Sequence, residues 1–248
     1  MDDSTTAVLA IMTLVTTLVF TAASALPRLK VTLRPQPAYN KMPSMIGNAI
    51  ESDRPLHISL GSAGIGGEST VLAVAVAELA YQLAKRATIG DTSPLLTLSN
   101  ASAFPLAQDT LRRAYQSRGM LAQYSPLSAR WYPAGERSLA FAAALTTLIP
   151  TENISGSVLA GSYGIEIGLI MDASQRKNQL VIGTSDQLDG QAVAYVLGGA
   201  PLIGEEVFTA GAYLEGEPGS LRVPLTIDAL RWVVIAVMLI GLLVTLGD

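Results

Sequence analysis

Two long apolar runs bracket the chain. Residues 7–26 contain no charged side chain over twenty positions, which at ~1.5 Å rise per residue matches the ~30 Å hydrocarbon core of a bilayer. The second run, 229–248, holds Arg231 before its final Asp248, and the arginine can reach the headgroups beside Trp232. We therefore predict an N-terminal transmembrane helix within residues 1–27 and a C-terminal transmembrane helix over 229–248.

A cleaved signal peptide is the alternative interpretation of the first run. The small residues Ala23, Ser24 and Ala25 resemble a cleavage site. Signal peptides begin with positive charge, however, whereas this chain begins with Asp2 and Asp3. The sequence therefore favours a retained anchor.

Basic residues next to the apolar runs predict the orientation in the membrane. Lys and Arg near the ends of a span mark its cytoplasmic side. They lie on the inner flanks of the two runs, at Arg28, Lys30, Arg34 and Lys41 and again at Arg222 and Arg231. We expect a two-pass protein of the cell membrane whose central domain is cytoplasmic and whose two termini lie on the opposite side.

Short apolar segments and longer amphipathic segments alternate between the two runs. The strands expected are 56–60, 94–98, 130–132, 157–160 and 179–182, and the helices are 69–86, 105–118, 137–148, 165–174, 188–197 and 204–214. This alternation is typical of an α/β fold with a Rossmann-like parallel sheet. We place that domain at residues 55–228, after a Pro-rich connector, 28–54, with one short helix near Ser44 to Ile50.

Composition narrows the classes of protein. The chain of 248 residues is 50% hydrophobic and 15% charged, with a net charge of −4, which excludes a disordered chain and a basic nucleic-acid-binding protein. It has no cysteine and one histidine, so thiolate catalysis and zinc–thiolate sites are excluded, and we expect neither a metal nor another cofactor.

The segment between the two runs is poor in charge. About 16% of residues 28–229 are charged, against ~25% in ordinary domains. A surface covered by other subunits explains this deficit, and an Ala-rich domain with an ordinary surface is the alternative. We expect partners in the form of further copies of the chain, a larger membrane complex and the lipid bilayer.

A glycine-rich loop follows the first expected strand. Gly61, Gly64, Gly66 and Gly67 stand where Rossmann-like proteins lay a phosphate against backbone N–H groups. The spacing is G-x-x-G-x-G instead of G-x-G-x-x-G, and no P-loop lysine is present. The glycines either bind an anionic ligand or allow close packing of a helix on a strand.

Small polar residues follow three other expected strands, where an open α/β sheet forms its ligand crevice. Candidate pocket residues are Ser99, Asn100, Ser162, Glu166, Ser185 and Asp186. Glu166 and Asp186 could act as the general acid and base of a hydrolase, but Asp186 is equally placed to cap the next helix. We expect no catalytic residue here, and a hydrolase ranks third among the functions considered.

Three segments together resemble a family of uncharacterised bacterial membrane proteins, found in Chloroflexus-like bacteria and classed as a domain of unknown function. They are Arg54 to Gly67, Ala160 to Glu166, and Ile203 to Leu214. The resemblance covers most of the chain. It implies a membrane protein with an α/β domain, and it implies no activity, cofactor or catalytic residue.

The expected function follows from the two anchors and the charge-poor domain. We predict a non-enzymatic integral membrane scaffold or accessory subunit whose cytoplasmic α/β domain drives oligomeric assembly. The alternative is a membrane-tethered domain that binds or senses a nucleotide-like anion through the glycine loop and the polar strand ends. Nothing in the sequence indicates a nucleic-acid partner.

Overall fold

The computed structural model describes residues 33–198 and 200–215 and scattered positions closer to the two termini. Arg34–Ala210 form one compact unit, and the terminal residues belong to a second unit. The two expected membrane spans lie largely outside the described residues. Within the described part, no helix has the length and apolar character needed to cross a bilayer.

A five-stranded parallel sheet forms the centre of the Arg34–Ala210 unit, which confirms the predicted Rossmann-like α/β fold. Its spatial order is β3-β2-β1-β4-β5, so the order reverses between β1 and β4, as at the ligand crevice of open α/β sheets. The strands are β1 (Leu56–Gly61), β2 (Leu95–Leu98), β3 (Ala129–Trp131), β4 (Gly156–Ser162) and β5 (Leu180–Ser185). We call the side on which all five strands end the carboxyl edge.

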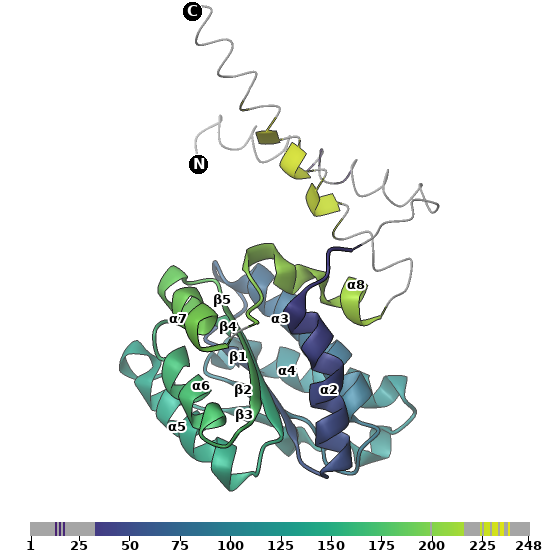
Figure 1. Cartoon of the computed structure of the whole chain (residues 1–248). Helices are drawn as coiled ribbons and strands as arrows, with labels where there is room; N and C mark the ends of the chain where they lie inside the picture. The colour runs from purple at the N-terminus through teal and green to yellow at the C-terminus, as the bar shows by residue number, and fades with distance from the viewer. Residues whose placement is uncertain are drawn as a thin grey trace, which may run out of the picture. The chain divides into compact units, whose positions relative to one another are not determined.

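Helices cover both faces of this sheet. Figure 1 shows helices on both faces of the sheet, an arrangement that is typical of parallel strands joined by helical crossovers. The first face carries α2 (Pro37–Glu51), α3 (Thr70–Ala87) and α4 (Phe104–Ser117), and the second carries α5 (Leu139–Thr151), α6 (Ile167–Gln175) and α7 (Leu188–Gly198).

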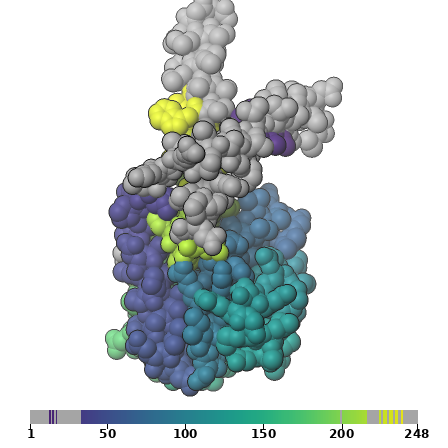
Figure 2. Space-filling model, turned by 90° about the vertical axis from the view of Figure 1, so that its right-hand side faces the viewer, coloured from purple at the N-terminus to yellow at the C-terminus, as the bar shows by residue number. Residues whose placement is uncertain are grey.

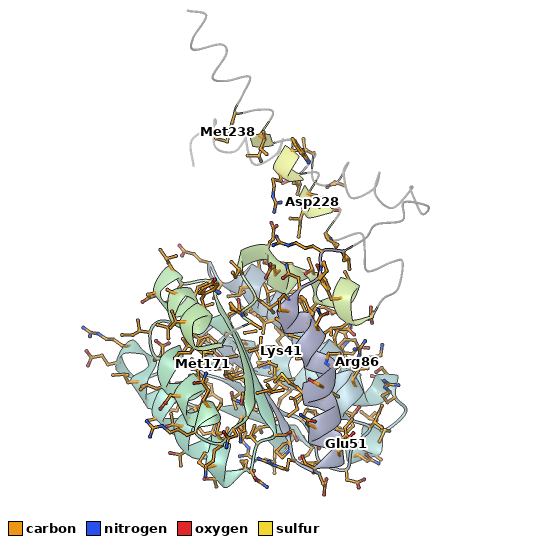
Figure 3. The ribbon with its side chains drawn as sticks, in the orientation of Figure 1. Lys41, Glu51, Arg86, Met171, Asp228 and Met238 are labelled. Carbon is orange, nitrogen blue, oxygen red and sulfur yellow. The ribbon has the colours of Figure 1, made fainter. Side chains whose placement is uncertain are left out.

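The two cores differ in polarity. The sheet residues packed under α2, α3 and α4 include Leu56, Ile58 and Leu60 of β1, which are buried and apolar. Under α5 and α6, the core combines apolar side chains such as Phe141, Leu145 and Ile170 with Tyr163. The side chain of Met171, a residue of α6 labelled in Figure 3, packs against β5, with its Sδ 3.1 Å from the position that a Cβ would take at Gly183. The central strand β1 is therefore buried on both faces, which explains its short, uncharged sequence.

The segment before β1 is more regular than the sequence indicated. The expected short helix is the 15-residue helix α2, whose buried side chains repeat at helical spacing at Tyr39, Met42, Ile46 and Ala49. Pro37 stands at the start of α2, where proline is favoured, and Pro43 lies inside it. Figure 2 shows α2, in purple, on the outer surface of its layer.

The last expected helix is also different. Residues 204–214 form a 3-10 turn, η5 (Gly204–Thr209), followed by a short helix, α8 (Ala210–Leu214). Glu206 causes part of the difference, because its carboxylate accepts a hydrogen bond from the Ile203 N–H at 2.8 Å and fixes the start of the turn.

Candidate functional site

The glycine loop is attached to both neighbouring strands at the carboxyl edge. Gly61 ends β1 with a φ of 60°, and a Cβ there would lie 2.5 Å from the Ser162 carbonyl oxygen, so the site favours glycine. The Ser62 N–H and hydroxyl both donate to that carbonyl, at 3.0 and 2.9 Å. On the other side, the Ser99 N–H and hydroxyl donate to the Gly61 carbonyl, at 2.8 and 3.1 Å. The structure thus brings Gly61, Ser99 and Ser162 together.

The N–H groups of this loop already donate hydrogen bonds to hydroxyl groups of the same domain. The Gly64 N–H donates to Ser69 Oγ at 3.0 Å, and the Ile65 N–H donates to Ser102 Oγ at 2.8 Å. The N–H groups of Gly66 and Gly67 both donate to Thr70 Oγ1, at 3.0 and 3.1 Å. These are the donors that would hold a phosphate in a dinucleotide-binding loop. An anion would have to displace three hydroxyl groups to reach them.

Asn100 has a structural role beside the loop. Its Oδ1 accepts hydrogen bonds from the N–H and the hydroxyl of Ser102, at 3.1 and 2.9 Å, and so caps the short turn Ala101–Ala103. A Cβ built at Gly64 would lie 2.0 Å from Asn100 Nδ2. Gly64 is therefore a close-packing position. The glycine loop and the end of β2 are consequently packed against each other.

The ends of β4 and β5 are joined by a second set of internal hydrogen bonds. Ser185 Oγ donates to the Tyr163 carbonyl at 2.6 Å and accepts from the Tyr163 N–H at 3.0 Å. Gln187 Nε2 donates to Ser162 Oγ at 3.0 Å. Gln191 Oε1 accepts from the Ser185 N–H at 2.8 Å. Ser162 and Ser185 therefore hold β4 and β5 to the start of α7.

Glu166 and Asp186 occupy different environments. Glu166 is buried, and its Oε1 accepts a hydrogen bond from the Gly164 N–H at 2.9 Å. Asp186 is exposed, and its backbone N–H donates to the Gly161 carbonyl. The Glu166 carboxylate thus closes a turn of its own loop, and nothing in its contacts requires a role in acid or base catalysis.

A polar strip crosses the sheet beneath this edge. His57 is fully buried on β1, with Nδ1 3.2 Å from Ser157 Oγ and Nε2 2.8 Å from Thr97 Oγ1. The Tyr163 hydroxyl donates to Ser59 Oγ at 2.7 Å. Desolvation by burial lowers the pKa of His57 to about 3 and raises the pKa of the Tyr163 hydroxyl. Both groups are neutral at pH 7 and cross-link adjacent strands.

Several residues that shape this edge were missed by the sequence analysis. They are the hydroxyl acceptors Ser69, Thr70 and Ser102 and the amides Gln187 and Gln191. Asn100 followed two positions later by Ser102 is a short polar pattern typical of a capped turn, and it was the one available signal.

The cavities described lie away from this edge. A groove of about 470 Å³ runs between α5 and α6 and is lined by Leu139, Leu169 and Arg176 among others. A smaller one of about 250 Å³ contains Ser93, Ser125 and Arg130. Across the described residues, no group of three His, Cys, Asp or Glu side chains could hold a metal ion. The candidate ligand residues are thus assembled at one edge, but they bond to one another.

The comparisons identify a family. Neither the curated proteins nor the solved structures give a match. A family model described as Domain of unknown function (DUF6754) matches residues 2–247. The matched segment includes the sheet, its covering helices, the first apolar run and all of the second run except its last residue, Asp248. The chain therefore belongs to the DUF6754 family.

Proposed function

We propose that this protein is a non-enzymatic, membrane-tethered scaffold or accessory subunit whose α/β domain associates with further copies of itself through α7. Residues 7–26 and 229–248 are the proposed tethers, with the basic flanks on the cytoplasmic side. The observation that carries the proposal is the outer surface of α7.

That surface is an apolar stripe. Leu188, Tyr195 and Val196 are 86%, 62% and 79% exposed, and the small residue Ala192 is exposed between them. Their spacing of i, i+4, i+7 and i+8 places all four on one face of the helix. We call these four residues the α7 stripe. The inner face of α7 is occupied by Ala194, which is fully buried against the domain.

A helix with apolar side chains on both faces is usually buried on both. The four stripe residues are uncharged, and the nearest charged residue of α7 is the exposed Asp189, which lies at the border of the same face near one end of the helix. Ala192 at its centre allows close approach of two helices. Tethering in one membrane also raises the effective concentration of the domains, so a contact of one helix per copy suffices.

The ligand-binding alternative is less well supported by the contacts. Four successive N–H groups of the glycine loop are held by hydroxyls of the same domain. The buried Glu166 adds negative charge near the crevice. A nucleotide-like anion would compete with these hydroxyls for the N–H groups of the loop, and it would approach the carboxyl group of Glu166. Assembly therefore remains the better account of this domain.

Introducing charge on the α7 stripe tests the proposal. We expect Tyr195→Glu with Val196→Glu to lower the mass of the detergent-solubilised full-length protein, measured by light scattering, because two copies would bring four carboxylates together. Leu127→Glu is the matched control, because Leu127 is 78% exposed and lies outside the stripe. A monomeric wild-type protein, or equal masses for all three proteins, would refute self-association through α7.

A further inference from the structure

The groove between α5 and α6 is lined by one side of each helix. The two helices are neighbours on the second face of the sheet (Figure 1). The side chains that line the groove include Leu139, Ala143 and Pro150 from α5, and Leu169, Ala173 and Arg176 from α6 and its C-cap. Their spacing of i, i+4 and i+11 on α5, and of i, i+4 and i+7 on α6, keeps each set on one side of its helix. The groove therefore follows the two helices along their length.

Helix α5 is apolar toward this groove as well as toward the sheet. Its 13 residues include no charged side chain. Leu139 at its start and Leu169 on the facing helix are 50% and 51% exposed. Thr146 also lines the groove, and its hydroxyl donates to the Ala143 carbonyl at 2.8 Å. An apolar ligand would therefore bury leucine surface without depriving this hydroxyl of its hydrogen bond.

The charged groups of the groove lie at the end remote from the carboxyl edge. Arg176 Nε lies 2.8 Å from Asp172 Oδ2, and Glu152, which follows α5 at the same end, is 2.6 Å from Arg130. Both carboxylates are thus paired with an arginine. Lys177 also lines the groove, and within the described part of the chain it has no ion-pair partner. One positive charge therefore remains uncompensated at this end.

The opposite end of the groove has no such surplus of positive charge. Glu136 and Arg137 precede α5 and are both exposed, and the buried Glu166 precedes α6. The two carboxylates outnumber the one guanidinium. A ligand with a single negative charge is therefore attracted to the Lys177 end and is not attracted to the Leu139 end.

The dimensions of the groove suit one extended alkyl chain. Leu139 and Pro150 are 11 positions apart on α5, a length of about 16 Å along the helix. Neighbouring helices pack with their axes ~8–10 Å apart, so the groove between them has the width of a side chain and not of a third helix. Dodecanoate, with eleven C–C bonds of ~1.5 Å, is about 14 Å long when extended. The volume of about 470 Å³ also lies in the usual range of small-molecule sites.

We infer that the groove between α5 and α6 binds a single-chain fatty acid, with its alkyl chain between Leu139 and Leu169 and its carboxylate at Lys177. Burial of the chain provides the attraction, and a charge-assisted hydrogen bond from the Lys177 ammonium fixes the direction of the ligand. The site lies within the Arg34–Ala210 unit and includes no residue of the α7 stripe. The inference therefore goes beyond the proposed self-association and does not depend on it.

Photo-cross-linking of the full-length chain in nanodiscs tests the site. The probe is dodecanoate with a diazirine at the end of its alkyl chain, and mass spectrometry of tryptic peptides locates the attachment. We expect labelling of the peptide between Arg137 and Arg176, at the Leu139 end of the groove, and loss of this labelling with excess dodecanoate. Dodecanol has the same chain without the charge, so we expect it to compete about tenfold less well or worse.

Two pairs of variants separate binding in the groove from unspecific labelling. Ala143→Trp fills the groove and should abolish the labelling, whereas Thr147→Trp, at an exposed position of the same helix outside the lining, should retain it. Lys177→Glu should raise the concentration of dodecanoate that halves the labelling by about tenfold or more. Lys41→Glu makes the same change of charge at an exposed position of α2 and should leave that concentration unchanged.

Several results would overturn the inference. Absence of label between Arg137 and Arg176, label that excess dodecanoate does not remove, or equal labelling of the wild type and Ala143→Trp would refute the groove as the binding site. Equal competition by dodecanol and dodecanoate, or equal behaviour of Lys177→Glu and the wild type, would refute recognition of the carboxylate. None of these results bears on self-association through α7, which is measured separately by mass.

Discussion

Replacing Gly190 with alanine is expected to destabilise the domain by about 1–3 kcal/mol or more, the range of overpacked buried sites. Gly190 is buried in α7, and a Cβ there would lie 2.0 Å from the Tyr163 carbonyl oxygen and 2.9 Å from that of Gly164. Both obstacles are backbone atoms at the end of β4, so no side-chain rotation relieves the clash. Helix α7 would have to move away from the sheet.

Urea unfolding of the solubilised chain measures this effect against a matched glycine. Gly47 lies inside α2, and no described atom lies within 4 Å of a Cβ built there. Gly47→Ala should therefore raise the free energy of unfolding by roughly 0.5–1 kcal/mol, the usual gain in a helix interior. Equal free energies for Gly190→Ala and the wild type would show that α7 does not pack as described.

Acid should destabilise the protein through His57. Burial lowers the folded-state pKa of this side chain to about 3, from 6.5 in the unfolded chain. Between these values the unfolded state binds one more proton, so stability is complete above pH 6.5 and falls as the pH drops toward 3. The expected loss between pH 7 and pH 4.5 is about 2.5 kcal/mol.

A variant without the imidazole isolates this contribution from the carboxylates that titrate in the same range. His57→Gln retains a polar side chain between Thr97 and Ser157, so it can keep part of the hydrogen-bonding strip. Its own stability at pH 7 is immaterial, because the quantity compared is the change with pH. We expect the variant to lose about 2.5 kcal/mol less than the wild type between pH 7 and pH 4.5. Parallel pH profiles for the two proteins would contradict this assignment.

Much of the fold could be predicted from the sequence because the strands are short, apolar and buried on both faces. Strand β1 is one residue longer than the expected strand 56–60. Helix α3 begins and ends one residue later than the expected helix 69–86. Helix α2 was underestimated because Pro37 and Pro43 are helix breakers in most positions. Its buried stripe stabilises the helix nonetheless.

The candidate site could be located from the sequence, but its bonding could not. Parallel topology alone places Gly61, Ser99, Ser162 and Ser185 at one edge. Which hydroxyl meets which loop N–H depends on the path of the loop, and Ser102 lies 37 positions from Ile65. The apolar character of the α7 surface was visible in the sequence. Its exposure became evident only when Ala194 and Gly190 were found on the inner face.

Cross-linking in native membranes tests most directly whether copies of this protein meet through α7. The chain has no cysteine, so Val196→Cys and Leu127→Cys each introduce a single thiol at an exposed site. Self-association through the α7 stripe predicts a covalent dimer of Val196→Cys with a short bis-maleimide and no dimer of Leu127→Cys. A monomer at position 196, or equal dimer yields at the two positions, would contradict it.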